Sequence, residues 1–293
     1  MEHRILGIDE NGLGPLLGPL VVTGTLLKYQ ISDNRWFKDI TDSKLFFKTR
    51  NRAHFALIEE TVISIFYVCK KRKPKSPAEI FKVFCRQSEC SQTINICTNS
   101  IPSEFLWADP EKSKKRCLEF SEWVVKNNIV IENLQCIFIC PMQFNTFTVK
   151  NTKLFLDFRA FCTIINGVKQ KESLHVDAGK IGGLKFYLPY LRYVMTNYEA
   201  EVVSEKDNAS VYILANKEVR IAIGFFMDVE KYSFPAALSS IIGKYIRELS
   251  MFSIRRNLNI KEDISGYYDR KTKQYINNVN LGKLPTECVF RKN

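Results

Sequence analysis

The apolar positions of the first thirty residues fall into two short runs separated by a glycine-rich stretch. Residues 4–8, "RILGI", predict a short buried strand. The run from Leu20 to Tyr29 is rich in β-branched and aromatic residues and follows a Gly-Pro turn. We therefore expect a second strand there, paired with the first as a hairpin.

The pattern changes after residue 41. Phe55, Leu57, Ile58 and Val62 recur at near-helical spacing, which predicts a helix that Asp42 or Ser43 can cap. The run at 62–70, "VISIFYVCK", is β-branched and aromatic, so we expect a third strand there.

The segment from about 68 to 130 breaks the alternation of strands and helices. It begins with the basic run from Lys70 to Lys75, in which Pro74 marks a loop. We interpret this run as a solvated loop, and a phosphate-contacting patch is the weaker alternative. We expect 68–130 to be an irregular insertion in a single domain spanning 1–293.

Regular patterns return after residue 128. They first predict one long strand or a strand pair at 129–140, a helix at 151–166 and a strand ending at Asp177. A helix at 184–197 follows, with Pro189 near its start or at a kink. The last elements are strands at 200–205, 211–216 and 219–226, a long helix at 233–257, and a turn with a short helix at 264–276. Strands preceding helices, with hairpins among them, predict an α/β fold whose sheet is mixed and flanked by helices.

Composition narrows the class of protein. The 293 residues carry a formal net charge of +12 and a 45% hydrophobic fraction, which predict a folded, basic protein with nucleic acid as its most common kind of partner. No run of about twenty apolar residues occurs and no apolar leader follows the charged start. We therefore expect a cytoplasmic protein without a membrane partner, and no obligate protein partner is predicted.

Nine cysteines are scattered along the chain without the spacing of a zinc knuckle. They favour reduced structural thiols. A metal site built from Cys85, Cys90 and Cys97 is the weaker alternative.

The candidate chemistry lies in carboxylates at the ends of predicted strands. Asp9 and Glu10 end the first strand, Asp177 ends another, and Asp228 and Glu230 precede the long helix. Such positions can converge at one edge of an α/β sheet. Oxygen ligands without His or Cys favour Mg²⁺ or Mn²⁺, and two such ions would support phosphodiester hydrolysis. Alternatively, two of these acids have structural roles: Asp177 starts a turn, and Glu230 lies at a helix N-terminus, where the helix dipole favours a negative charge.

Five segments, in order, resemble motifs of the ribonuclease HII family. They are "GIDENGLGPLLGPLVV" from Gly7, "TDSKLF" from Thr41, "LHVDAGKI" from Leu174, "FPAALSSIIGKYIREL" from Phe234 and "ISGYYDRKT" from Ile264. The resemblance covers roughly 3–67 and 140–280. It implies a ribonuclease H-like fold and a hydrolase that cuts the RNA strand of RNA–DNA hybrids, or of DNA duplexes containing ribonucleotides, and leaves 5′-phosphate ends.

The resemblance also assigns residues. It implies that Asp9, Glu10, Asp177 and Glu230 are the catalytic metal ligands, with Asp228 competing with Glu230 for the fourth place, where the family has Asp. Contacts to nucleic acid would come from Gly12, Leu13, Gly14, Ser43, Lys44, Lys180, Lys244 and Tyr267. His175 is read as a strand residue beside the site that could assist a proton transfer.

One departure stands out in the glycine turn. Leu13 lies between two glycines where the family has Arg, so a cation that could pair with phosphate is missing.

The sequence leaves three hypotheses for the function of the protein. The first is an active endoribonuclease on hybrids, the second a nucleic-acid-binding protein of the same fold with weakened catalysis, and the third a nuclease acting on structured DNA.

Overall fold

The sheet is built around the predicted N-terminal hairpin. In the computed structural model, β1 (Glu2–Asn11) pairs antiparallel with β2 (Leu20–Gln30), with Asp9 opposite Thr23.

The structure describes residues 2–30, 40, 51–87, 95–168, 173–262, 264–278 and 286–292. Within them, eight strands form one sheet in the order β3-β4-β2-β1-β5-β8-β7-β6. The other strands are β3 (Cys85–Gln87), β4 (Val130–Ile139), β5 (Leu174–Gly179), β6 (Glu199–Glu205), β7 (Ala209–Ala215) and β8 (Arg220–Phe226).

The sheet is mixed, as the sequence predicts. Strands β1, β5 and β8 run parallel to one another in its centre. The pairs β2–β4, β6–β7 and β7–β8 are antiparallel, and β3 pairs parallel with β4. The carboxyl ends of the three central strands therefore meet at one edge.

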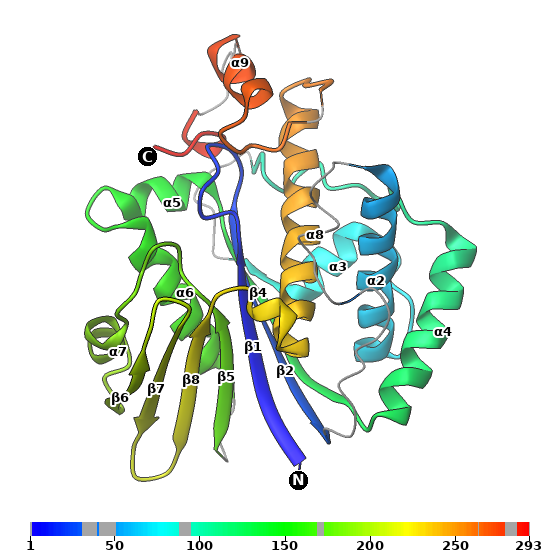
Figure 1. The fold of residues 1–293 in the computed structure, drawn as a ribbon. Helices are drawn as coiled ribbons and strands as arrows, with labels where there is room; N and C mark the ends of the chain where they lie inside the picture. Colours follow the sequence, from blue (N-terminus) through cyan, green and yellow to red (C-terminus); the bar gives the residue numbers. More distant parts are fainter. Residues whose placement is uncertain are drawn as a thin grey trace.

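Helices cover both faces of the sheet (Figure 1). On one side lie α2 (Arg52–Lys70), α3 (Pro77–Phe84), α4 (Pro110–Lys126) and α8 (Phe234–Asn257), and on the other α5 (Pro141–Thr148), α6 (Lys153–Gly167) and α7 (Leu188–Val194). A short C-terminal helix, α9 (Arg270–Asn278), and the 3₁₀ turns η1 (Val229–Lys231) and η2 (Thr286–Cys288) complete the elements. The structure is an α/β fold with a mixed sheet flanked by helices.

Helix α8 lies directly on β1. A Cβ atom added to Gly7 would sit 2.0 Å from the backbone nitrogen of Ala236, so only glycine permits this approach. The contact fixes where the first turns of α8 cross the strand that carries Asp9.

The third predicted strand, at 62–70, is wrong. These residues form the second half of α2, which begins after Asn51, whose side chain accepts a hydrogen bond from the Ala53 amide at 2.9 Å. Val62, Ile65 and Phe66 are fully buried, so packing on all sides explains a run that lacks the polar face of a surface helix. Asp42 and Ser43, the expected caps, lie outside the described residues.

The expectation of an irregular segment at 68–130 is also wrong for much of its length. Helices α3 and α4 and strand β3 lie there, and β3 extends the sheet beside β4. Glu59 of α2 ties the intervening loop to the helix by accepting hydrogen bonds from the amides of Trp107 and Ala108 at 2.7 and 2.8 Å. The segment is thus packed into the same hydrophobic core as α8.

The described cysteines are free thiols, and most of them are buried. Among the described helices, none combines the length and the apolar character needed to cross a membrane.

Candidate active site

An open cavity of ≈ 600 Å³ lies where the three parallel strands end. The turn after β1, the end of β5, the β8–α8 connection and one side of α8 form its walls. It is lined by eight of the residues singled out from the sequence: Asp9, Glu10, Gly12, Lys180, Asp228, Glu230, Lys244 and Tyr267. This is the position at which α/β sheets usually bind ligands.

Asp9 and Glu10 reach the cavity from opposite faces of β1. The strand continues to Asn11, so consecutive side chains alternate between faces. Leu6 and Ile8 belong to the core on the α6 side, which places Glu10 on that face and Asp9 on the α8 face. The cavity therefore lies across the end of β1 and receives both carboxylates.

Asp9 lies against α8. Burial raises its pKa from 3.8 to about 6, while the Lys244 ammonium and the Ser240 hydroxyl act in the opposite direction. The nearby Glu230 carboxylate raises the Asp9 pKa further. On the neighbouring strand, a Cβ atom at Gly179 would come within 3.1 Å of Asp9 Oδ1, so the glycine keeps the space beside that oxygen open.

Glu10 is held by the turn that follows it. Its Oε2 accepts a hydrogen bond from the Leu13 amide at 3.1 Å. Burial raises the Glu10 pKa, and so does the neighbouring charge of Asp9, whereas the guanidinium groups of Arg291 and Arg247 lower it. Two half-buried acids thus follow one another at the end of β1, an arrangement that requires nearby positive charge.

The two candidates for the fourth carboxylate differ in their surroundings. Glu230 is buried, with 4% of its surface exposed, and its charge acts on Asp9. Asp228 is half-buried and pairs with Lys231, with 3.0 Å between Oδ2 and Nζ. Both line the cavity, and the Glu230 charge acts directly on one member of the acidic pair, Asp9.

Asp177 does not line the cavity. In the parallel pair of β1 and β5 it lies opposite Gly7, and Gly179 is the β5 residue level with Asp9. Two residues along a strand correspond to about 7 Å. Asp177 therefore faces the same side as Asp9 but one repeat farther from the open edge. Its neighbour His175 is exposed.

The glycine turn contributes only one of its three predicted nucleic-acid contacts to the cavity wall. Gly12 lines the cavity and has φ of 100°, a conformation that favours glycine. Leu13 is buried in the core on the α6 side, and Gly14 is exposed. Neither of these two residues is among those that line the cavity.

The predicted lysines differ in their surroundings. Lys244 is half-buried on the cavity wall. The Lys180 ammonium already donates to the carbonyl oxygens of Lys206 and Asp207, at 3.3 and 2.7 Å. Ser43 and Lys44 lie outside the described residues.

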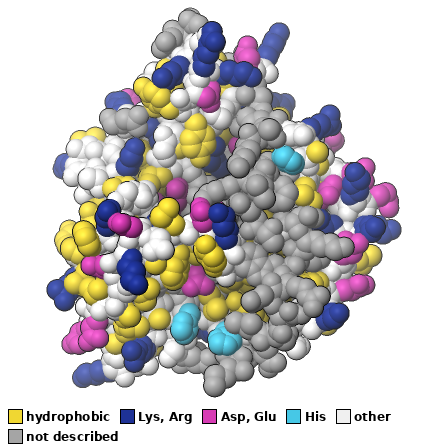
Figure 2. All heavy atoms as spheres, viewed as in Figure 1, with side chains coloured by type: hydrophobic (Ala, Val, Ile, Leu, Met, Phe, Trp, Pro, Cys, Tyr) yellow, Lys and Arg dark blue, Asp and Glu magenta, His cyan; other side chains and the backbone are white. Residues whose placement is uncertain are grey.

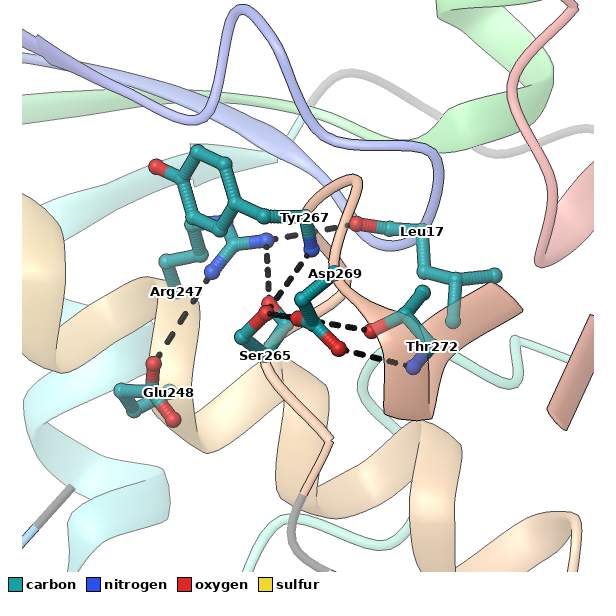
Figure 3. Close-up of polar contacts among 7 residues, drawn as sticks. All are labelled: Leu17, Arg247, Glu248, Ser265, Tyr267, Asp269 and Thr272. Carbon is teal, nitrogen blue, oxygen red and sulfur yellow. Dashed lines mark hydrogen bonds and ion pairs between the residues drawn. The ribbon is translucent and has the colours of Figure 1, made fainter. Parts of the chain in front are cut away.

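Arg247 organises the cavity wall near Tyr267, and Figure 3 shows this network. Its Nη2 donates to the carbonyl oxygens of Leu17 and Ser265, at 3.3 and 3.1 Å. The Tyr267 ring lies over the guanidinium, 5.0 Å from centroid to Cζ, and the Tyr267 amide donates to Ser265 Oγ at 3.0 Å. Asp269 accepts from the Ser265 hydroxyl, which fixes this loop. Tyr267 is thus held at the rim by a buried cation.

Sequence reasoning missed two charged residues next to Glu10. Asp157 of α6 is fully buried, and neither carboxylate oxygen has a hydrogen-bond partner among the described residues. Burial raises its pKa well above the ordinary value, and Glu10 and Asp9 add to the effect. An acid on the apolar stripe of a predicted helix was the available signal. Arg291, near the end of the chain, offered none.

The donor chemistry of the cavity fits a hard divalent cation. Asp9, Glu10 and Glu230 offer carboxylate oxygens, and Gly179 leaves space beside Asp9. Among the described residues, no three His, Cys, Asp or Glu side chains lie close enough together to hold one ion. Mg²⁺ commonly takes only one or two carboxylates and completes its shell with water and substrate phosphate. The residues present are compatible with that kind of site.

The chain matches no model of a known protein family and no curated protein. Solved structures show a distant similarity. The structure described as the PCNA:RNase HII complex from Archaeoglobus fulgidus matches with a TM-score of 0.44 and 16% identity, over 98% of this chain and 93% of that chain. Ribonuclease H2 from Pyrococcus horikoshii OT3 matches with a TM-score of 0.44 and 13% identity, over 99% and 92%. The structure described as Bst-RNase HIII in complex with Mn2+ matches with a TM-score of 0.41 and 13% identity, over 93% and 60%.

Proposed function

We propose that this protein is a metal-dependent endoribonuclease that hydrolyses the RNA strand of RNA–DNA hybrids. The observation that carries the proposal is the half-buried pair Asp9–Glu10 at the open end of three parallel strands, with Glu230 beside it in the same cavity. The five ordered motifs and the net charge of +12 support a nucleic-acid substrate.

The acidic residues would hold the cation. Asp9, Glu10 and Glu230 are the proposed ligands, and Glu230 is preferred to Asp228 because the latter pairs with Lys231. When bound, Mg²⁺ or Mn²⁺ would supply an activated water and stabilise charge on the scissile phosphate. Asp177 remains a proposed ligand, and the geometry supports it least, because it lies farther from the open edge.

The chain's own residues would bind and orient the substrate. Lys244 lies beside Asp9, so its ammonium is placed to contact a phosphate oxygen at the acidic site. Tyr267, fixed over Arg247, presents an aromatic face at the rim for a sugar or base. Gly12 brings backbone close to the cavity without a side chain in the way.

On the face seen in Figure 2, the charged side chains of the described residues are spread rather than gathered in one patch. Figure 2 shows described Lys and Arg side chains along the upper end and both sides of the viewed face, with acidic and hydrophobic side chains between them. The basic character would therefore act mainly as a long-range attraction for a polyanion.

A second candidate function is nucleic-acid binding with weakened catalysis. It is favoured by the buried side chain of Leu13, by the position of Asp177 outside the cavity and by the engagement of Lys180 with backbone carbonyls. Each of these removes a group that the ribonuclease HII resemblance places at the substrate.

Cleavage of three labelled duplexes separates the two functions. They are an RNA–DNA hybrid, a DNA duplex with one ribonucleotide and plain DNA, each with Mg²⁺ or Mn²⁺. We expect the protein to cut the RNA-containing duplexes. The Asp9→Asn variant should lose this activity, and the Asp207→Asn variant should keep it, because Asp207 is an exposed acid outside the cavity. Tight binding without cutting under either metal would favour the second function, and cutting of plain DNA would favour a nuclease of different specificity.

A further inference from the structure

The turn after β1 is closed by residues from the other end of the chain. The Arg291 amide donates to the Leu16 carbonyl at 2.9 Å, and Leu17 forms a bridge with Phe290. Lys292 continues the attachment, because its amide donates to Asn145 Oδ1 of α5 at 2.7 Å. The C-terminal segment 286–292 therefore lies between the turn and α5. Figure 1 shows the C-terminus beside the end of β1.

The Arg291 side chain spans the glycine turn. Its Nε donates to the Gly18 carbonyl at 2.8 Å, and its Nη1 donates to the carbonyls of Gly12 and, at 3.5 Å, Leu13. One guanidinium thus joins the first and last residues of the turn. The guanidinium also lies over the Phe144 ring, with 4.4 Å between its Cζ atom and the ring centroid. The guanidinium holds its donors in one rigid, planar fork, whereas the three donors of an ammonium rotate at the end of a flexible stem.

This guanidinium is a buried cation next to Glu10. Only 5% of the Arg291 surface is exposed, and its Nη2 has no hydrogen-bond partner among the described residues. Burial and the nearby Arg247 lower the Arg291 pKa to about 9, whereas Glu10 raises it. Burying a second cation near Arg247 is costly, and the negative charge of Glu10 offsets part of that cost.

The turn itself supplies no such charge. Leu13 packs into the core, and its amide is the group that holds Glu10 Oε2. Arg291 bonds the carbonyls on both sides of that amide, so its loss would free the peptide units that orient Glu10.

We propose that Arg291 is a positioning residue for Glu10: from the docked C-terminal segment it fixes the Gly12–Gly18 turn and provides the positive charge beside Glu10 that Leu13 does not. The candidate active site is then complete only when the C-terminal segment is in place. The catalytic consequence rests on the proposed function, whereas the structural consequence does not.

The test compares Arg291→Met, which removes the charge, with Arg291→Lys, which keeps the charge without the fork. Lys292→Met is the matched control, because it removes a charge from an exposed side chain in the same segment. The first readout is hydrogen exchange of the amides in 12–18, measured in the full-length protein without substrate. The second is the separation of kcat from KM on the hybrid duplex.

We expect the turn amides of Arg291→Met to exchange roughly tenfold faster, in line with the loss of charged hydrogen bonds, while β2 and β4 keep their protection. In that variant kcat should fall by about tenfold or more with KM nearly unchanged. Arg291→Lys should recover part of both, and Lys292→Met should match the wild type.

Unchanged exchange at 12–18 in Arg291→Met would overturn the proposal, and so would faster exchange spread evenly over the chain. If Arg291→Met does not fold, Arg291→Lys decides in the same way: local exchange supports the proposal and uniform or unchanged exchange overturns it. If the wild-type protein cuts no duplex, the proposed function fails, while the exchange result still decides the role of Arg291.

Discussion

Asp9 and Glu10 are adjacent in sequence, yet the protein surrounds them in different ways. Asp9 faces α8, where Ser240 and Lys244 reach it from one helix. Glu10 faces the opposite side, where Asp157 of α6 and Arg291 of the C-terminal segment come together from distant parts of the chain. Both carboxylates are half-buried, but one lysine acts on the first and two arginines act on the second.

This difference shows how one strand can present two acids with separate tasks. On the α8 side, the carboxylate has a hydroxyl and a lysine beside it, and we propose that this lysine contacts the substrate. On the C-terminal side, a backbone amide and two buried guanidinium groups hold the position of the Glu10 carboxylate.

Asp9→Asn should have the largest effect, a loss of about 10³-fold or more in kcat, because it removes a proposed metal ligand at the scissile phosphate. The folded protein should keep or gain thermal stability, since a partly desolvated carboxylate with a raised pKa is replaced by a neutral amide. Cleavage kinetics and thermal unfolding of the same preparation measure both. Full activity in Asp9→Asn would remove Asp9 from the catalytic set.

Gly7→Ala should destabilise the protein by about 3 kcal/mol, because the new Cβ would meet the backbone of α8 at Pro235 and Ala236. Gly14→Ala is the matched control, since no atom lies within 4 Å of a Cβ built there. Chemical denaturation measures both free energies of unfolding. Equal stability of the two variants would show that α8 can move away from β1 at little cost.

Asp157→Asn should stabilise the protein by about 1–3 kcal/mol at pH 8. Burial raises the Asp157 pKa in the folded state, and Glu10 and Asp9 raise it further, against the opposing charge of Arg291. Such an acid binds its proton more tightly when folded, so its contribution to stability is lost as the pH rises from about 4 toward the folded pKa.

The stabilisation by Asp157→Asn should therefore shrink as the pH falls and approach zero below about pH 3, where the acid is protonated in both states. Thermal unfolding across this pH range checks the trend. A destabilised Asp157→Asn at pH 8 would show instead that Asp157 is ionised and paired with Arg291.

Lys244→Met should have the smallest effect, a weaker affinity for duplex with a salt slope lowered by about 0.9, as for one lost phosphate contact. The comparison is Lys115→Met on α4, an exposed lysine outside the cavity. Titrations of labelled duplex at several salt concentrations measure both slopes. Equal slopes for the two variants would place Lys244 away from the phosphates.

The sequence by itself determined the strands and helices whose hydrophobic periodicity was clear. The hairpin of β1 and β2, helices α6 and α8, and strands β5 to β8 follow from local patterns, since each buries one face or both in a regular way. It also indicated that Asp9, Glu10 and Glu230 lie near strand ends or a helix start, which suffices to bring them to one edge of the sheet.

Only the tertiary structure decided the rest. Residues 62–70 became helix because α2 is packed on more than one side, so burial overrode a β-like composition. Asp177 lies below the cavity because strand register, which the sequence does not display, aligns Gly179 with Asp9. Asp157 and Arg291 reach Glu10 only through long-range packing. Periodicity records which face of an element is buried, whereas register and the docking of distant segments depend on contacts that no local pattern encodes.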